Sequence, residues 1–256
     1  MGWRIPESLK VRSQHGSADK AIDPFSICSI SSSELKLGKD EVLFTEGCAA
    51  DHVYVVKSGL CFSYRNLEDG RRQIIDLAFP GDFAGLEALT QSSFVSGFAA
   101  LTAAQLVAYP VADFTERCYA EPALSRTLVE CIAREQSILT KRLVGVAHTS
   151  ASQRIAHFLL EVRVRALTSL KLQPLKNGDA CHFLAPDTGD FHLKLPQAVI
   201  ADTLGLSIVH VSRTLSKLKE EGLIDQSSTG MRYRDLEGLK TIAVWEGLAP
   251  WFEEAS

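Results

Sequence analysis

The spacing of apolar residues changes along the chain, and its first long region has the pattern of β-structure. From Leu37 to Tyr109, short apolar runs alternate with glycine, aspartate and proline. The strand-length runs are Val42–Phe44, Val53–Val56, Leu60–Phe62, Gln73–Ile75 and Leu106–Ala108. Turn signals separate them at Glu46–Gly47, Lys57–Gly59, Glu68–Gly70 and Pro80–Asp82. Many short strands at close spacing, joined by such turns, predict an all-β sandwich or barrel.

After Pro122 the apolar spacing becomes helical. Successive steps of four, seven, four and three residues place one set on a single helix face: Leu128, Ile132, Leu139, Leu143 and Val146. A long amphipathic helix beside a β domain has to bury that stripe. We predict that Leu128, Ile132, Leu139 and Leu143 pack against a partner helix in a coiled-coil-like dimer. The alternative is that the stripe packs only on the chain's own β domain.

The strongest local pattern runs from Leu195 to Ile224 and predicts a helix-turn-helix. Pro196 suits the first turn of a helix, where its missing N–H costs nothing. Gly205 can adopt the left-handed conformation that ends this helix and opens a tight turn. Ser207 can then cap a second helix through its hydroxyl. Two ordinary packed helices with a glycine turn are the alternative.

The second of these helices has one apolar side and one polar side. Val211, Leu215 and Leu218 are spaced to point inward. Residues 225–234, with a turn at Gly230, fit a wing hairpin. A second helix of this kind enters the DNA major groove, where an arginine can pair with guanine O6 and N7. The predicted DNA-binding residues are Ser207, Val209, His210, Ser212, Arg213, Ser216 and Lys217 on the helix, with Arg232 and Arg234 on the wing.

These patterns give a domain plan of class α+β. Residues 1–32 show little periodicity and are expected to form an N-terminal arm. Residues 33–121 are expected to form a β-roll (jelly roll) sensor, 122–147 a dimerisation helix, and 148–256 a winged helix-turn-helix domain. A helix is expected over about residues 152–167. Residues 172–190 contain two prolines and two glycines and are expected to form a loop or weak hairpin.

Composition narrows the class of protein without changing this plan. The chain has 256 residues, 46% of them hydrophobic and 23% charged, which is typical of a soluble globular protein. It has no run of about 18 apolar residues and no secretory signal pattern, so we expect a cytoplasmic protein with no membrane association. The net charge of −4 argues against indiscriminate coating of nucleic acid, but a reader of DNA needs only a local basic face.

Several motifs together resemble the cyclic-AMP receptor/fumarate-nitrate regulator (CRP/FNR) superfamily over about residues 37–242. The similar segments are Gly38–Lys39, Phe44–Gly47, Val55–Gly59, Phe79–Asp82 with Gly85–Glu87, and Leu204–Ser207 leading to Val211–Leu215. The resemblance implies a transcription regulator that binds a pseudo-palindromic operator as a homodimer. It also implies a cyclic-nucleotide-binding-like roll whose effector reorients the DNA-binding heads. RNA polymerase is the further partner that we expect.

The chain departs from that family's pattern in two places. Members usually carry a glutamate four residues before the recognition arginine, and here Val209 takes that position beside His210. The typical half-site is therefore not expected. The segment after Gly85–Glu87 also has no arginine to pair with a cyclic phosphate, and neither Arg71 nor Arg72 lies at the matching place. We therefore expect no binding of cyclic nucleotides, and the effector stays unidentified.

Other chemistries find little support in the sequence. Only Cys28 lies before the roll, whereas an iron–sulfur version needs several closely spaced cysteines there. The remaining cysteines are interpreted as structural thiols, with redox sensing by one exposed thiol as an alternative. A metal-dependent cupin enzyme needs two or three converging histidines, and the roll has only His52. We predict no catalysis, metal or cofactor. The alternative function is a protein-interaction or redox-sensing adaptor that does not bind DNA directly.

Overall fold

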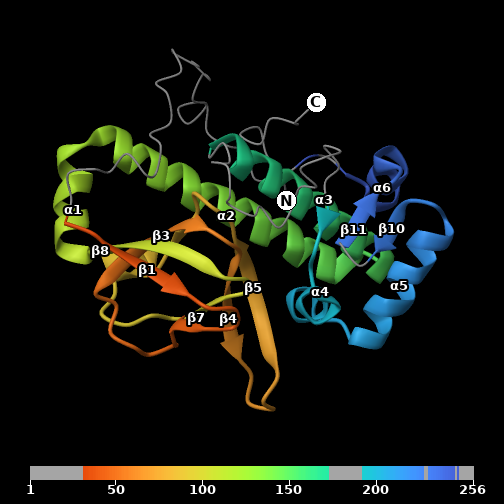
Figure 1. The fold of residues 1–256 in the computed structure, drawn as a ribbon, viewed down its shortest axis with the longest axis horizontal. Coiled ribbons are helices and arrows are strands. Elements are labelled where there is room, and N and C mark those ends of the chain that lie inside the picture. Colours follow the sequence, from red (N-terminus) through yellow and green to blue (C-terminus); the bar gives the residue numbers. More distant parts are fainter. Residues whose placement is uncertain (1–30, 173–191, 228–229, 246, 248–256) are drawn as a thin grey trace, which may run out of the picture.

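The computed structural model describes residues 31–172, 192–227, 230–245 and 247. A β-roll lies at one end of the molecule and a small helical head at the other, and one long helix runs along the roll toward the head (Figure 1). The predicted N-terminal arm, apart from its last two residues, lies outside the described residues. So does most of the predicted loop or hairpin over residues 172–190.

The roll consists of two four-stranded sheets in which all strand pairs are antiparallel. One sheet has the order β1 (Ser33–Leu37), β8 (Ala104–Pro110), β3 (His52–Ser58), β6 (Phe83–Ala84). The other has the order β2 (Val42–Phe44), β7 (Gly97–Ala100), β4 (Cys61–Asn66), β5 (Arg72–Ala78). All five predicted strands are confirmed. Strands β1, β6 and β7 were not predicted, since β6 has two residues and β7 is buried throughout and so shows no alternation.

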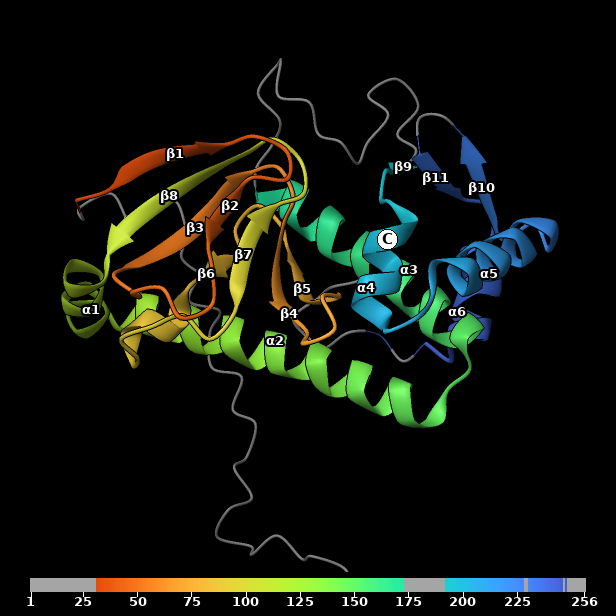
Figure 2. The same ribbon diagram turned by 90° about the horizontal axis from the view of Figure 1, so that it is seen from below.

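Three helices connect the roll to the head, and a short 3-10 turn lies within the roll between β6 and β7. The elements are η2 (Leu86–Leu89), α1 (Val111–Ala120), α2 (Pro122–His148) and α3 (Ala151–Leu172). Helix α2 is the predicted long helix and has Pro122 in its first turn. The break before α3 carries a reciprocal cap: Gln153 N–H donates to Ser150 Oγ at 3.3 Å, and Ser150 N–H donates to Gln153 Oε1 at 2.8 Å. Helix α3 then turns back toward the roll (Figure 2).

Helix α2 has two adjoining apolar faces, and only one of them is covered within the chain. Leu124, Leu128 and Cys131 belong to the core of the roll, and Ile138 packs against Val164 of α3. The prediction that Leu128 faces a partner chain is therefore wrong, because this side chain is 5% exposed in its own roll. Residue spacing shows that the stripe exists but not which edge of it meets the neighbouring sheet.

The second apolar face of α2 is exposed. Its large apolar side chains are Val129, Ile132, Leu139, Leu143, Val144 and Val146, between 41% and 71% exposed. Five of these positions, together with exposed Gln136, recur at alternating steps of three and four residues: 129, 132, 136, 139, 143 and 146. That alternation is the 3.5-residue repeat of a two-helix seam.

The head is a winged helix-turn-helix, as predicted. It contains β9 (His192–Leu193), α4 (Gln197–Leu204), α5 (Ile208–Glu220), β10 (Ile224–Ser227), β11 (Gly230–Tyr233) and α6 (Leu236–Ala243). Its three strands pair in the order β10-β11-β9. Within the described residues no single helix is long and apolar enough to cross a membrane, and only the bent pair of α4 and α5 passes that test together.

Candidate nucleic-acid interface and roll cavity

The turn between α4 and α5 has the geometry that its residues predicted. Gly205 ends α4 in the left-handed region, with φ of 63°. Ser207 caps α5, and its Oγ accepts from the backbone N–H of His210 at 3.2 Å. Pro196 is the N-cap of α4 rather than a member of its first turn. The two helices meet at a bend of 112°, within the range of DNA-binding helix-turn-helix motifs.

The apolar side of α5 is buried and its other side is exposed. Val211, Leu215 and Leu218 are at most 2% exposed and hold the helix in the head. Exposed on the other side are Ser207, Val209, His210, Arg213, Ser216 and Lys217, while Ser212 is half-buried. Ile208 is also exposed, at 54%, and was not predicted as a site residue. Helical spacing gave no signal for this exposure, because Ile208 precedes Val211 by three residues and would be expected on the inward face.

Five of the predicted residues come together around one surface depression of about 320 Å³. It is lined by Ser207, Val209, His210, Arg213, Thr214 and Lys217. The cationic side chains of Arg213 and Lys217 therefore lie near the imidazole of His210 and the isopropyl group of Val209, within the first three turns of α5. Such a set can donate to base edges and phosphates and can also contact a thymine methyl group.

The wing places its two arginines differently. Arg234 is exposed, and its Nη2 donates to Asp225 Oδ2 across the hairpin at 3.0 Å. Arg232 is half-buried and lies opposite Asp225 in the β10–β11 register. Asp225 therefore offsets part of the positive charge that the wing would present to a phosphate.

A cavity of about 310 Å³ lies between the roll and α2. Its charged lining residues are Arg65, Asp76, Asp82, Glu87, Glu135 and Arg165. Arg65 was not predicted from the sequence; it lies on β4 and forms an ion pair with Glu46. Four carboxyl groups against two guanidinium groups make this a poor environment for an anionic cyclic phosphate.

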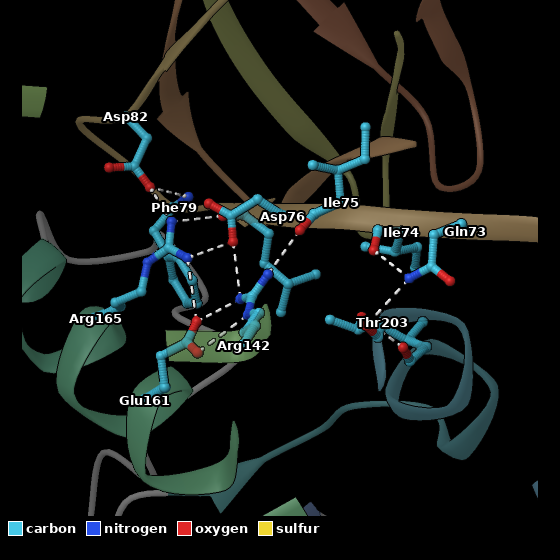
Figure 3. A network of polar contacts seen from close by, with 12 residues as sticks. Gln73, Ile74, Ile75, Asp76, Phe79, Asp82, Arg142, Glu161, Arg165 and Thr203 are labelled. Carbon is cyan, nitrogen blue, oxygen red and sulfur yellow. Dashed lines mark hydrogen bonds and ion pairs between the residues drawn. The ribbon is translucent and has the colours of Figure 1, made fainter. Parts of the chain in front are cut away.

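Beside this cavity, a buried ionic cluster joins β5, α2 and α3 (Figure 3). Arg165 of α3 donates to Asp76 Oδ1 at 2.7 Å and to Asp82 Oδ2 at 3.0 Å. Arg142 of α2 donates to Asp76 Oδ1 at 2.9 Å and also pairs with Glu161. Burial alone would raise the pKa of Asp76, but Arg165 and Arg142 outweigh it and hold that pKa below its usual value.

Comparisons with known proteins agree with both halves of this architecture. Residues 34–120 match the cyclic nucleotide-binding domain, and residues 153–242 match the Crp-like helix-turn-helix domain. The nitrogen fixation regulation protein FixK of Bradyrhizobium diazoefficiens is 32% identical over 90% of this chain and 94% of its own. The chain belongs to the CRP/FNR family of transcription regulators.

Two further relatives support the same assignment. The transcriptional activatory protein AadR of Rhodopseudomonas palustris is 31% identical over 82% of this CRP/FNR-family chain and 80% of its own. The solved structure of FixK2 from Bradyrhizobium japonicum superposes with a TM-score of 0.70 at 27% identity, covering 83% of this chain and 98% of that one. The exposed surface of α5 is thus part of a DNA-binding transcription regulator.

The thiols of this CRP/FNR-family member differ in exposure. Burial raises the pKa of Cys61 to about 12 and that of Cys131 to about 11, so both are poor nucleophiles at neutral pH. Cys48 is exposed, and its pKa is lowered by the hydroxyl of Thr45 at 3.1 Å. In the described part of the chain no three His, Cys, Asp or Glu side chains are grouped to hold a metal. Cys28 lies outside the described residues.

Of the cavity's four carboxyl groups, Glu87 and Glu135 form no ion pair with another described residue, and Glu135 is the one on α2 beside the ionic cluster. Asp76, Asp82 and Glu161 are matched by Arg134, Arg142 and Arg165. Burial, followed by the charges of Asp76 and Asp82, raises the pKa of Glu135 to about 7, against the opposing effect of Arg165 and Arg134. At neutral pH the protonated form of Glu135 is therefore well populated.

We predict that Glu135→Gln removes a pH dependence of stability. Because the folded pKa lies above the ordinary 4.5, the folded state binds more protons than the unfolded state between about pH 4.5 and 7. Stability therefore falls as the pH rises through that window, by on the order of 2–3 kcal/mol. Denaturant titrations at pH 5 and pH 8 should show the variant matching the wild type at the lower pH and exceeding it at the higher.

Glu130→Gln is the matched control for this prediction. Glu130 lies on an exposed part of the same helix and lines no part of the cavity. That variant should keep the wild-type dependence. An equal change in both variants would show that the effect comes from the net charge and not from the cavity.

Proposed function

We propose that two copies of this chain pair along α2 and read a pseudo-palindromic operator with their two α5 helices. The observation that carries the proposal is the convergence of Val209, His210, Arg213 and Lys217 on one exposed surface of α5. A twofold dimer presents that surface twice, which matches a site whose half-sites are centred about one helical turn apart. The wing residues Arg232 and Arg234 then lie on the phosphate side of the head.

Each α5 side chain has a distinct role in this proposal. Arg213 is exposed in the second turn, where its guanidinium can donate to guanine O6 and N7. Val209 is 59% exposed and offers a methyl contact to thymine, and His210 offers one hydrogen bond. Ser216 and Lys217 lie one turn further along and suit phosphate contacts. Val209 in place of the family's glutamate implies a half-site different from the family's usual one.

The exposed seam of α2 supports the dimer. Leaving five large apolar side chains at a 3.5-residue repeat in water is unfavourable, and a second copy of the same helix would bury them. We retain Ile132, Leu139 and Leu143 as interface residues. Leu128 is replaced by Val129, which occupies the exposed position next to it. The regulator is inferred to act in the cytoplasm, in contact with RNA polymerase.

Base reading and phosphate anchoring can be separated by two substitutions. Arg213→Ala should cost roughly 1–3 kcal/mol of operator binding and flatten the preference at one symmetric base position. Arg232→Ala should weaken binding to all sequences alike and lower the salt slope by about one. Binding-site selection and salt titrations on both variants measure these effects. The recognition helix would be misassigned if Arg213→Ala kept full sequence preference while Arg232→Ala lost it.

A leucine pair on α2 separates dimer contacts from core packing. Leu143→Ala, at a position 71% exposed, should weaken dimerisation roughly tenfold or more while each protomer keeps its fold. Leu128→Ala should instead lower the free energy of unfolding by about 2–5 kcal/mol, since it opens a cavity in the roll. Sedimentation equilibrium and denaturant unfolding distinguish the two. A wild-type monomer that bound the full operator tightly would refute the proposed dimer.

The acidic cavity makes a prediction about effectors. Cyclic AMP or cyclic GMP should leave the operator affinity unchanged, because an added phosphate would face Asp76, Asp82, Glu87 and Glu135 with both cavity arginines already paired. Isothermal titration calorimetry with each nucleotide tests this directly. Binding at micromolar concentration would contradict the prediction and revive a nucleotide sensor.

A further inference from the structure

Strand β5 is the edge of its sheet, and the head docks against that edge. In the order β2-β7-β4-β5, its second side has no strand neighbour among the described residues. Arg72, at its first position, donates to Asp202 Oδ2 of α4 at 3.2 Å. Gln73 Nε2 donates to the backbone oxygen of Thr203 at 3.1 Å. The first two residues of a roll strand therefore bind the C-terminal turn of the first helix of the helix-turn-helix.

The middle of the same strand is held by α2 and α3. Arg142 Nη1 donates to the backbone oxygen of Ile75 at 2.6 Å, and Arg165 Nη2 donates to that of Leu77 at 2.6 Å. Ile75 is the residue that the β4–β5 register skips, between Ile74 and Asp76. At that irregularity Arg142 supplies the hydrogen-bond donor that the backbone of a neighbouring strand would otherwise supply. Figure 3 shows Arg142 beside Ile75, and Gln73 beside Thr203, along this strand.

Apolar contacts continue across the same boundary. One core cluster contains Phe62, Ile74 and Leu77 of the roll together with Val211 and Leu218 of the head. The guanidinium of Arg72 also lies 4.7 Å from the centre of the Phe62 ring, so this side chain is fixed on its roll side before it reaches Asp202. The position of α5 relative to the roll, and hence to α2, is set through these contacts.

We propose that Arg72 and Asp202 are positioning residues for operator binding. They touch no DNA. Their ion pair, with Gln73, fixes the place of α4 on β5 and through it the separation of the two α5 helices in the dimer. They therefore determine the spacing between half-sites that the protein accepts. This inference rests on the proposed function, because half-site spacing has meaning only for a dimer on an operator.

The test compares operators of optimal spacing with operators one base pair longer or shorter. Arg72→Ala and Asp202→Ala should each reduce the wild-type preference for the optimal spacing by roughly fivefold, near the lower end of couplings between sites. The exchanged pair, Arg72→Asp with Asp202→Arg, should restore much of that preference. A loss of general stability would weaken binding to all three operators alike and would not be rescued by the exchange.

Arg71→Ala is the matched control. Arg71 is the neighbouring arginine and forms an ion pair with Asp69 within the same roll hairpin, so its removal changes the net charge equally. It should keep the wild-type spacing preference. The proposal is overturned if Arg72→Ala and Asp202→Ala behave like Arg71→Ala, or if the exchanged pair is no better than either single variant.

A measurement without DNA separates this inference from the proposed function. In the free protein, Arg72→Ala should accelerate amide hydrogen exchange in α4, since the docked helix is released more often, whereas Arg71→Ala should not. If the wild type binds no operator, the proposed function fails and the exchange data still test the docking. If it binds operator but α4 exchange is the same in both variants, the docking inference fails alone.

Discussion

Two arginine side chains removed from water constrain how the three parts of this molecule fit together. Arg165 is 3% exposed and Arg142 is 11% exposed. A buried guanidinium is tolerable only when carboxylates and carbonyl oxygens satisfy it, and removing one partner is strongly destabilising. Their partners come from β5, the turn before β6 and α3. The sheet edge, the long helix and the base of the head must therefore be in place together.

The same constraint explains why α3 belongs to both ends of the molecule. Its apolar residues Ile155, Phe158 and Leu159 join the core that continues into the head, while Glu161 and Arg165 reach the roll. The hydroxyl of Tyr233, in the wing, donates to the backbone oxygen of Leu159 at 2.7 Å. A chain of contacts therefore runs from Asp76 through α3 to the wing.

The elements that the sequence predicted are those whose signals are local. Gly205, Ser207 and the spacing of Val211, Leu215 and Leu218 all act within a few residues, so the helix-turn-helix could be placed closely. The ionic cluster could not, because Arg142 and Arg165 are 66 and 89 positions from Asp76. A partial signal existed: Glu161 and Arg165 stand four residues apart among the apolar positions of α3, where isolated charges are costly.

The incorrect predictions also concern contacts between segments that are far apart in the sequence. Leu128 and Val129 are adjacent in the sequence, and only the position of the roll decides which of them is covered. Arg65 could not be assigned to the cavity from the sequence, because it lies on β4 and joins the cavity wall only through the pairing of β4 with β5. Contacts across the sheet pairings, such as Ser63 with Asp76, bring distant residues to one wall. Periodicity carries no information about such pairings.

In the proposed dimer, one amide on the exposed seam of α2 would affect which chains can pair. Gln136 lies midway between Ile132 and Leu139, where the other seam positions are apolar. In a parallel pair of these helices the two amides face each other and can bond. A helix shifted by one heptad would instead bury one amide against Leu143 and the other against Val129, each without a partner. A relative whose seam is apolar throughout would meet the same penalty, so the amide favours pairing between identical chains over mixed dimers.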